Sequence, residues 1–235
     1  MTSPRGAPVH RSLPNPWADL VLVVTQARGL DREEAPRAFF ERMAVIGADT
    51  APRRVPMRQG DLVMGARLRL GGATALLGLP AEELTDNPTA LEDLWGAPAA
   101  RLAERIRQAG SQAEALSHFQ EALCRRLAGA PAPAFPRVIE ALAGVPGTFR
   151  VDEAAARAGV TPRQLQRLFL RWVGVGPKLF ARLLRFERAV KLLGRVHAPD
   201  WHGAAAELGY ADRSHLVREF REFGGLPPVQ LLGSL

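Results

Sequence analysis

The sequence contains a single cysteine, Cys124, so no disulfide bond can form within the chain. Proteins of oxidising compartments commonly contain paired cysteines, and we therefore expect the reducing cytoplasm. No run of about 18 apolar residues occurs, which argues against a transmembrane helix. The N-terminal segment also lacks the apolar core of a secretory signal. Together these absences predict a cytoplasmic protein that does not contact a membrane.

Residues with metal-binding or catalytic chemistry are few and scattered along the chain. The five histidines share no ligand spacing with the cysteine, so we predict no metal site and no cofactor. No arrangement of nucleophile, base and acid stands out, and we predict that the protein is not an enzyme.

Positive charge is concentrated in the C-terminal part of the chain. Residues 147–235 carry 14 Lys and Arg against 8 Asp and Glu, whereas residues 1–146 carry 17 against 16. Nearly all of the net charge of +7 therefore lies in the C-terminal part. A basic segment beside a neutral one is typical of a polyanion-binding module joined to another domain, although a solvated basic surface would look the same.

The N-terminal part combines extended and helical patterns after a Pro- and Arg-rich stretch, residues 1–15, which we expect to be a flexible tail. Three apolar runs are typical of β-strands, namely residues 19–25, 38–47 and 60–70, although the second could also be helical. Helical periodicity follows over residues 89–110 and 111–129, and Ser111 with Glu114 predicts a capping box. We expect an α+β domain over residues 16–129, in which these two helices form an antiparallel hairpin.

A Pro- and Ala-rich linker, "APAPAFP" at residues 130–136, separates this domain from a second one over residues 137–235. The second domain shows helical patterns only. The predicted helices span residues 137–144, 152–158, 162–173, 178–195, 201–208, 212–223 and 228–232. The predicted fold class is therefore mostly α, with a small β-containing N-terminal domain.

One pattern occurs twice in the second domain. The stretch "VTPRQLQRLFLRWVGVGP" starts at Val160, and "YADRSHLVREFREFGGLPP" starts at Tyr210. An offset of 51 residues superposes Leu165 on Leu216 and Phe169 on Phe220. Each copy has an Ala-Ala pair and a Gly turn before it, which is the layout of a helix-turn-helix.

The side chains expected on the outer face of each copy can reach base edges, where Arg favours guanine and Gln favours adenine. The predicted base contacts are Arg163, Gln164, Gln166, Arg167, Arg213, Ser214, His215 and Arg218. The predicted phosphate contacts are Thr161, Arg171, Lys178, Arg182 and Arg185. A plain helical bundle with a repeated polar face is the other interpretation of the same pattern.

Residues 137–232 resemble the DNA-binding domain of the AraC/XylS family, in which a long helix joins two helix-turn-helix motifs. The resemblance rests on "AAARAGVTPRQLQRLFLRWVGVGPKLFARLLRFERAVKLL" and "AAAELGYADRSHLVREFREFGGLPP". It implies a bacterial transcription regulator that binds double-stranded DNA through two adjacent major-groove segments. It also implies an N-terminal domain that senses effectors or dimerises, often through a cupin-like barrel, for which the β segments here are too few. RNA polymerase, a small-molecule effector and a second copy of the chain are the further partners that the resemblance suggests.

Two other functions fit a domain that binds DNA. One is a DNA-modifying or alkyl-transfer protein that reacts through Cys124 and uses the C-terminal domain for targeting. We expect this cysteine to be packed in the core, on the apolar side of a helix, which disfavours that function. The expected neighbours are Leu116, Phe119, Leu123 and Leu127. The other is an architectural DNA binder of low sequence specificity.

Overall fold

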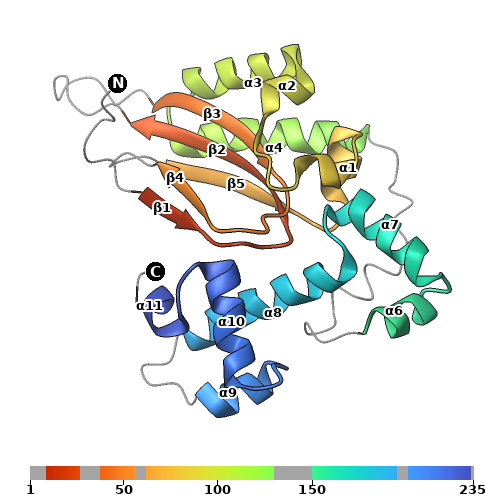
Figure 1. Cartoon of the computed structure of the whole chain (residues 1–235). Coiled ribbons are helices and arrows are strands. Elements are labelled where there is room, and N and C mark those ends of the chain that lie inside the picture. The colour runs from red at the N-terminus through yellow and green to blue at the C-terminus, as the bar shows by residue number, and fades with distance from the viewer. Residues whose placement is uncertain (1–8, 27–37, 57–61, 130–149, 195–200, 234–235) are drawn as a thin grey trace, which may run out of the picture.

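The structure, a computed structural model, describes residues 9–26, 38–56, 62–129, 150–194 and 201–233. An N-terminal unit contains strands and helices, and the described part of the C-terminal unit contains helices only (Figure 1). The predicted fold class is therefore confirmed. The predicted linker over residues 130–136 and the predicted helix over residues 137–144 lie outside the described residues.

A four-stranded antiparallel sheet forms the centre of the N-terminal unit, with the strand order β5-β2-β3-β6. Its strands are β2 (Ala18–Gln26), β3 (Ala38–Ile46), β5 (Leu62–Leu68) and β6 (Thr89–Ala90). All three runs predicted from their apolar residues are strands, and the helical alternative for the second is wrong. Alternate residues of a strand share a face, and Leu20, Leu22, Met43 and Val45 are fully buried on the helix-covered side.

A separate two-stranded sheet pairs β1 (Val9–Ser12) with β4 (Arg53–Pro56). Backbone hydrogen bonds between Asn15 and Asp49 (3.1 and 2.9 Å) continue this contact. Residues 9–15 are therefore ordered, in contrast to the tail predicted from their composition. Their backbone groups are paired with a strand distant in the sequence, which local composition does not reveal. The described strands form two open sheets and no closed barrel.

Helices complete the N-terminal unit. They are α1 (Gly72–Leu77), the 3₁₀ helix η1 (Ala81–Leu84), α2 (Leu91–Trp95), α3 (Ala97–Gln108) and α4 (Gln112–Ala128). The single helix predicted over residues 89–110 is wrong, because Gly96 interrupts it with a φ of 60°. The predicted cap of α4 is present, since Ser111 Oγ accepts from the Glu114 amide (3.1 Å). In a capping box the Glu114 side chain would accept from the Ser111 amide. It accepts instead from the amide of the preceding residue, Gly110 (2.8 Å).

Cys124 lies on the exposed side of α4, so the prediction of a packed core thiol is wrong. The buried residues of this helix are Ala115, Phe119 and Leu123. Cys124 follows Leu123 directly and is rotated by about 100° around the helix axis, which carries it out of the core. Leu127, expected in the same core, is on the same face as Leu123 but is 45% exposed, because it lies in the last turn of α4.

The C-terminal unit consists of short helices around one long helix. They are α6 (Val151–Arg157), α7 (Pro162–Val173), α8 (Pro177–Leu193), α9 (Trp201–Glu207), α10 (Arg213–Gly224) and α11 (Pro228–Leu232). These helices agree with the predicted ones to within two residues at each end. Aromatic rings from α7, α8 and α10 meet edge to face, with Phe169 and Phe180 centroids 5.4 Å apart and Phe186 and Phe220 centroids 5.2 Å apart. The long helix α8 thus shares one core with both motifs. Within the described ranges, no helix has the length and apolar character needed to cross a bilayer.

The two units are packed against each other at the C-terminal ends of α7 and α10. Thr85 Oγ1 donates to the carbonyl of Gly174 (2.9 Å), and Thr74 Oγ1 donates to the carbonyl of Arg171 (3.1 Å). On the second motif, Arg11 donates to the carbonyl of Gly224. The last carbonyls of a helix have no partner within it, so these three bonds satisfy groups that the motifs leave open. The N-terminal unit therefore contacts both helix-turn-helix motifs at once.

Gly174→Ala should disrupt this contact and lower the free energy of unfolding. Gly174 has a φ of 93°, and a Cβ there would lie 2.5 Å from Thr85 Oγ1 and 2.9 Å from the Ala81 carbonyl oxygen. The matched control is Gly159→Ala in the turn of the first motif, where φ is 64° but no atom lies within 4 Å of the added Cβ. We expect Gly159→Ala to lower the free energy of unfolding by about 1–2 kcal/mol through backbone strain, and Gly174→Ala to lower it by at least about 1 kcal/mol more. Urea unfolding measures both losses. Equal losses of stability in the two variants would show that the N-terminal unit is not closely packed against Gly174.

Candidate nucleic-acid interface

The first helix-turn-helix consists of α6 and α7, with a left-handed turn at Gly159 between them. Thr161 begins α7 in a capping box: its hydroxyl accepts from the Gln164 amide (3.2 Å), and its amide donates to Gln164 Oε1 (2.8 Å). Pro162 occupies the first helical turn, where its missing amide hydrogen costs nothing. Gly174 ends the helix in the left-handed conformation. The start and end of the helix are thereby both fixed by local chemistry.

The predicted base contacts on α7 all lie on its exposed side, whereas Leu165 and Phe169 are fully buried. The side chains of Arg163 and Arg167 make no hydrogen bond or ion pair with any other residue in the described ranges. Gln164 is partly engaged, because its side chain belongs to the capping box. The Gln166 amide lies against the turn after α7, where a Cβ on Gly176 would come within 2.6 Å of Nε2. Arg163 and Arg167 are consequently the side chains of this helix that are most available to a ligand.

The second helix-turn-helix consists of α9 and α10, with a left-handed turn at Gly209. Asp212 caps α10 by accepting from the His215 amide (2.7 Å). The Ala211 amide donates to His215 Nδ1 (3.3 Å), and His215 Nε2 lies 3.6 Å from Glu219 Oε1. Because Nδ1 accepts, the ring hydrogen of the neutral imidazole lies on Nε2 and is directed to Glu219. His215 is therefore partly used inside the domain, whereas Arg213, Ser214 and Arg218 are exposed.

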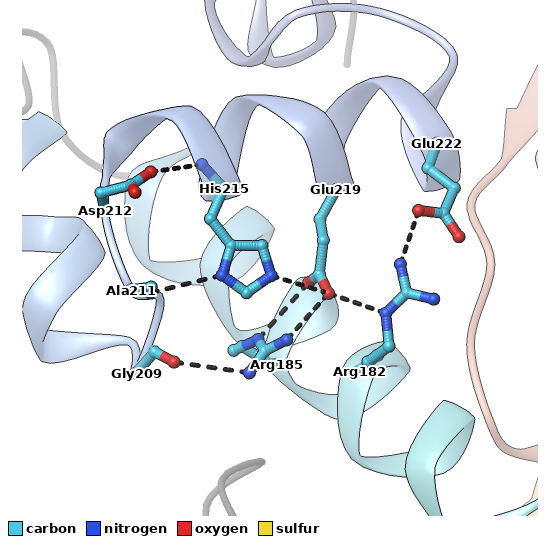
Figure 2. A network of polar contacts seen from close by, with 8 residues as sticks. All are labelled: Arg182, Arg185, Gly209, Ala211, Asp212, His215, Glu219 and Glu222. Carbon is cyan, nitrogen blue, oxygen red and sulfur yellow. Dashed lines mark hydrogen bonds and ion pairs between the residues drawn. The ribbon is translucent and has the colours of Figure 1, made fainter.

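A buried glutamate joins α10 to α8, as Figure 2 shows. Glu219 is 1% exposed and accepts from Arg182 Nε (2.8 Å) and Arg185 Nη2 (2.8 Å). Arg182 extends the network to Glu222 on the surface. Arg185 also reaches the carbonyl of Gly209 in the turn of the second motif (3.4 Å). The network thus holds α10, the preceding turn and the long helix α8 together.

Aromatic rings enclose the two arginines of this network. The Arg185 guanidinium carbon lies 4.7 Å from the centroid of Tyr210, and that of Arg182 lies 4.7 Å from the centroid of Phe223. A guanidinium over a ring face gains from the negative potential of the ring. Burial, followed by the nearby charge of Glu219, raises the pKa of Tyr210, so its phenol stays neutral. The ion pairs are therefore partly shielded from water.

Stability should fall in acid because of Glu219. Burial alone would raise its pKa, but the hydrogen bonds from Arg185 and Arg182 outweigh burial and hold the pKa below the ordinary value of 4.5. As the pH falls, the carboxyl of Glu219 takes up a proton in the unfolded chain before it does so in the folded chain. The stabilising contribution of ionised Glu219 is therefore present above about pH 4.5 and is lost as the pH falls toward the folded pKa. Urea unfolding between about pH 3 and 6 should show a smaller slope with pH for Glu219→Gln. The exposed Glu222→Gln is the control, and the same slope in all three proteins would contradict this account.

The predicted phosphate contacts occupy different environments. Arg171 and Lys178 are exposed, and Thr161 is exposed but belongs to the capping box. Arg182 and Arg185 already have carboxylate partners, and sequence analysis missed this. The available signal was Glu219 itself, because it lies among Leu216, Phe220 and Phe223, which are buried on the same helix. A carboxylate in an apolar face needs a buried cation, and α8 offers two.

An open groove of about 590 Å³ lies between the two motifs. Its walls contain exposed or half-exposed cations from α8 and α10, together with the carboxylates of the network. The lining residues are Val151, Lys178, Ala181, Arg182, Arg185, Gly209, His215, Arg218, Glu219 and Glu222. Lys178 and Arg218 are the two cations of this groove that make no ion pair with another described residue. The described residues contain no group of three or more His, Cys, Asp or Glu that could hold a metal ion.

Residues 154–233 match a family model described as a helix-turn-helix domain. Among solved structures, a transcriptional regulator with an AraC-type DNA-binding domain from Chromobacterium violaceum is 23% identical, with a TM-score of 0.38, over 43% of this chain and 91% of that one. The C-terminal domain of AraT, a response regulator from Geobacillus stearothermophilus, is 21% identical, with a TM-score of 0.40, over 44% and 87%. ToxT from Vibrio cholerae with a bound unsaturated fatty acid is 10% identical, with a TM-score of 0.46, over 97% and 92%. No curated protein matches the chain.

Proposed function

We propose, from the premise that this chain belongs to the AraC/XylS family of DNA-binding transcriptional regulators, that α7 and α10 read two adjacent major-groove segments of one site. The observation that carries the proposal is the repetition of one exposed, basic and locally capped helix on both sides of α8. A single helix of this kind contacts only a few base pairs. Two such helices in fixed positions combine their discrimination between sequences.

The long helix supports this arrangement physically. Its 17 residues span about 25 Å and share a core with both motifs, so the separation of the recognition helices is set by a rigid element. Adjacent major-groove faces on one side of B-DNA lie about 34 Å apart. The two distances are of the same order, and the ion pairs of Glu219 hold α10 against α8.

Within this proposal the contacts have two roles. Arg163, Arg167, Arg213 and Arg218 approach base edges, with Gln164, Gln166, Ser214 and His215 beside them. Arg171 and Lys178 contact phosphate and position the protein on the duplex. Thr161 contacts phosphate at the N-terminal end of α7. Arg182 and Arg185 are not free cations, because both have carboxylate partners. They contribute to phosphate binding indirectly, by holding α10 in place.

Arg167→Ala and Arg218→Ala should each weaken binding to the specific site more than binding to random DNA. A base-edge arginine accounts for about 1–3 kcal/mol of discrimination, whereas a phosphate contact contributes equally on any sequence. The control is Lys178→Ala, which should weaken both kinds of binding together and reduce the salt dependence of binding. The site is first selected from a random-sequence pool with the full chain, and affinities are measured by fluorescence anisotropy. Proportional losses on both DNAs for all three variants would refute the assignment of roles.

A transcription regulator of this kind acts in the cytoplasm, and we propose that location together with RNA polymerase, a small-molecule effector and a second copy of the chain as partners. We also propose that the protein is not an enzyme. Exposure of Cys124 removes the packing argument against a reactive thiol, but the described residues contain no group of His, Cys, Asp or Glu that could hold a metal beside it. Thiolates react when a cation or metal lowers their pKa, so exposure alone does not favour alkyl transfer. The architectural alternative is tested by the same selection, since it would yield no preferred sequence.

A further inference from the structure

A cavity of about 440 Å³ lies on the N-terminal unit between α2, α3 and α4, away from both helix-turn-helix motifs. Its lining is half apolar and half cationic, and it contains no carboxylate. The residues are Trp95, Pro98, Arg101, Leu102, Arg105, Ala122, Arg125 and Arg126. The volume is in the range of sites that bind small organic molecules.

The apolar part of the lining is well fixed. Trp95 is 8% exposed and Leu102 is 4% exposed, and both belong to the core shared with the sheet. The Arg126 guanidinium carbon lies 5.4 Å from the centroid of the Trp95 ring and extends this wall. A rigid wall of this kind can pack against the apolar body of a ligand at little cost in side-chain entropy.

The four arginines differ in their partners. Arg105 donates to Glu121 (3.0 Å) and contacts His118 Nδ1 (2.8 Å), and Arg126 Nε contacts the Leu76 carbonyl (3.4 Å). The side chains of Arg101 and Arg125 are exposed and make no hydrogen bond or close ion pair with another described residue, although Glu121, one turn before Arg125, attracts it electrostatically. Like charges around one cavity repel each other unless an anion lies between them. Two guanidinium groups are therefore available to such an anion.

The wall also contains an unsatisfied donor. Trp95 Nε1 is buried and has no hydrogen-bond partner among the described residues. This nitrogen has essentially no accessible surface, so Trp95 offers the cavity an apolar contact rather than a hydrogen bond.

We propose that this cavity binds a small amphipathic organic anion, a carboxylate attached to an apolar body. Arg101 and Arg125 bind the carboxylate by charge-assisted hydrogen bonds, and Trp95 and Leu102 contact the apolar body. A neutral ligand would leave the Arg101 guanidinium without a counter-charge among the described residues. A twofold contact with a second copy places the same cationic surface of both chains together, which disfavours a dimer partner as the occupant. The inference rests on the proposed function only in that the bound anion would act as the effector.

The test is calorimetric titration of the full chain, without DNA, with phenylbutyrate, octanoate and indoleacetate and with the neutral amide of each. At least one carboxylate should bind with a dissociation constant below about 1 mM, and its amide should bind at least about tenfold more weakly. The double variant Arg101→Gln/Arg125→Gln should raise the dissociation constant about tenfold or more. Because no DNA is present, failure of DNA recognition leaves this result unaffected, and the two proposals fail independently.

The matched control is Arg107→Gln on the same helix α3. Arg107 is exposed and pairs with Glu104 outside the cavity, so this variant should bind as the parent does. Circular dichroism confirms that each variant is folded. The proposal is overturned if no carboxylate of the panel binds, if acid and amide bind equally, or if Arg107→Gln loses as much as the double variant. It is also overturned if sedimentation shows a dimer that the double variant disrupts, since a second copy would then occupy the cavity.

Discussion

Glu219→Ala should lower the free energy of unfolding by about 3–5 kcal/mol. The carboxylate is almost fully buried and is the shared partner of Arg182 and Arg185, whose side chains are 28% and 13% exposed. Removing it leaves two guanidinium groups close together, with Arg185 lacking any other carboxylate partner in the described ranges. Breaking a buried pair at one end costs more than the pair contributes, because the remaining charge stays desolvated. Urea unfolding of the full chain, followed by far-ultraviolet circular dichroism, measures the loss.

The exposed partner of the same network provides the control. Glu222 is 54% exposed and, among the described residues, pairs only with Arg182, so Glu222→Ala should cost less than about 1 kcal/mol. The contrast between the two glutamates separates burial from the mere presence of an ion pair. If both variants lose similar stability, or if Glu219→Ala unfolds at the parental urea concentration, the network does not anchor α10.

Sequence alone was sufficient for the helix-turn-helix helices because their ends are determined by neighbouring residues. Thr161, Pro162 and Gly174 fix α7 through a capping box, a constrained φ and a left-handed stop, and each of these signals is visible in the sequence. The buried positions Leu165 and Phe169 follow from helical periodicity in the same way. Local chemistry and tertiary packing agree in this part of the chain.

The features that sequence analysis missed depend on contacts between distant residues. β1 and β4 are four residues each, too short for an alternating pattern, and they are strands because they pair with each other. The packing of Thr85 and Thr74 on the end of α7 has no local signal either. The sequence shows that Arg182 and Arg185 are charged, but it does not show where their side chains point. Their orientation depends on Glu219, which is more than thirty residues away.

Separating the two halves of the selected DNA site by half a helical turn, about 5 bp, should abolish most of the specific affinity. In the proposed arrangement α7 and α10 are the recognition helices and both pack on α8, so they can contact only two segments on the same face of the duplex. Half a turn rotates one segment to the far side, where only one helix can bind. The loss should be about 100-fold or more, because the discrimination of one helix is removed. Competition against unmodified site, followed by fluorescence anisotropy, measures it.

A second insertion of a whole turn, about 10 bp, distinguishes a rigid connection from a flexible one. It restores the rotational phase but moves the segments roughly 34 Å further apart, a distance that α8 cannot span because its hydrogen-bonded length is fixed. Affinity should therefore stay low with both insertions. Recovery with the whole turn would show that the motifs separate and move independently, against the shared core and the Glu219 network. Full affinity with the half turn would show that one motif alone reads DNA and that the other serves only to complete the fold.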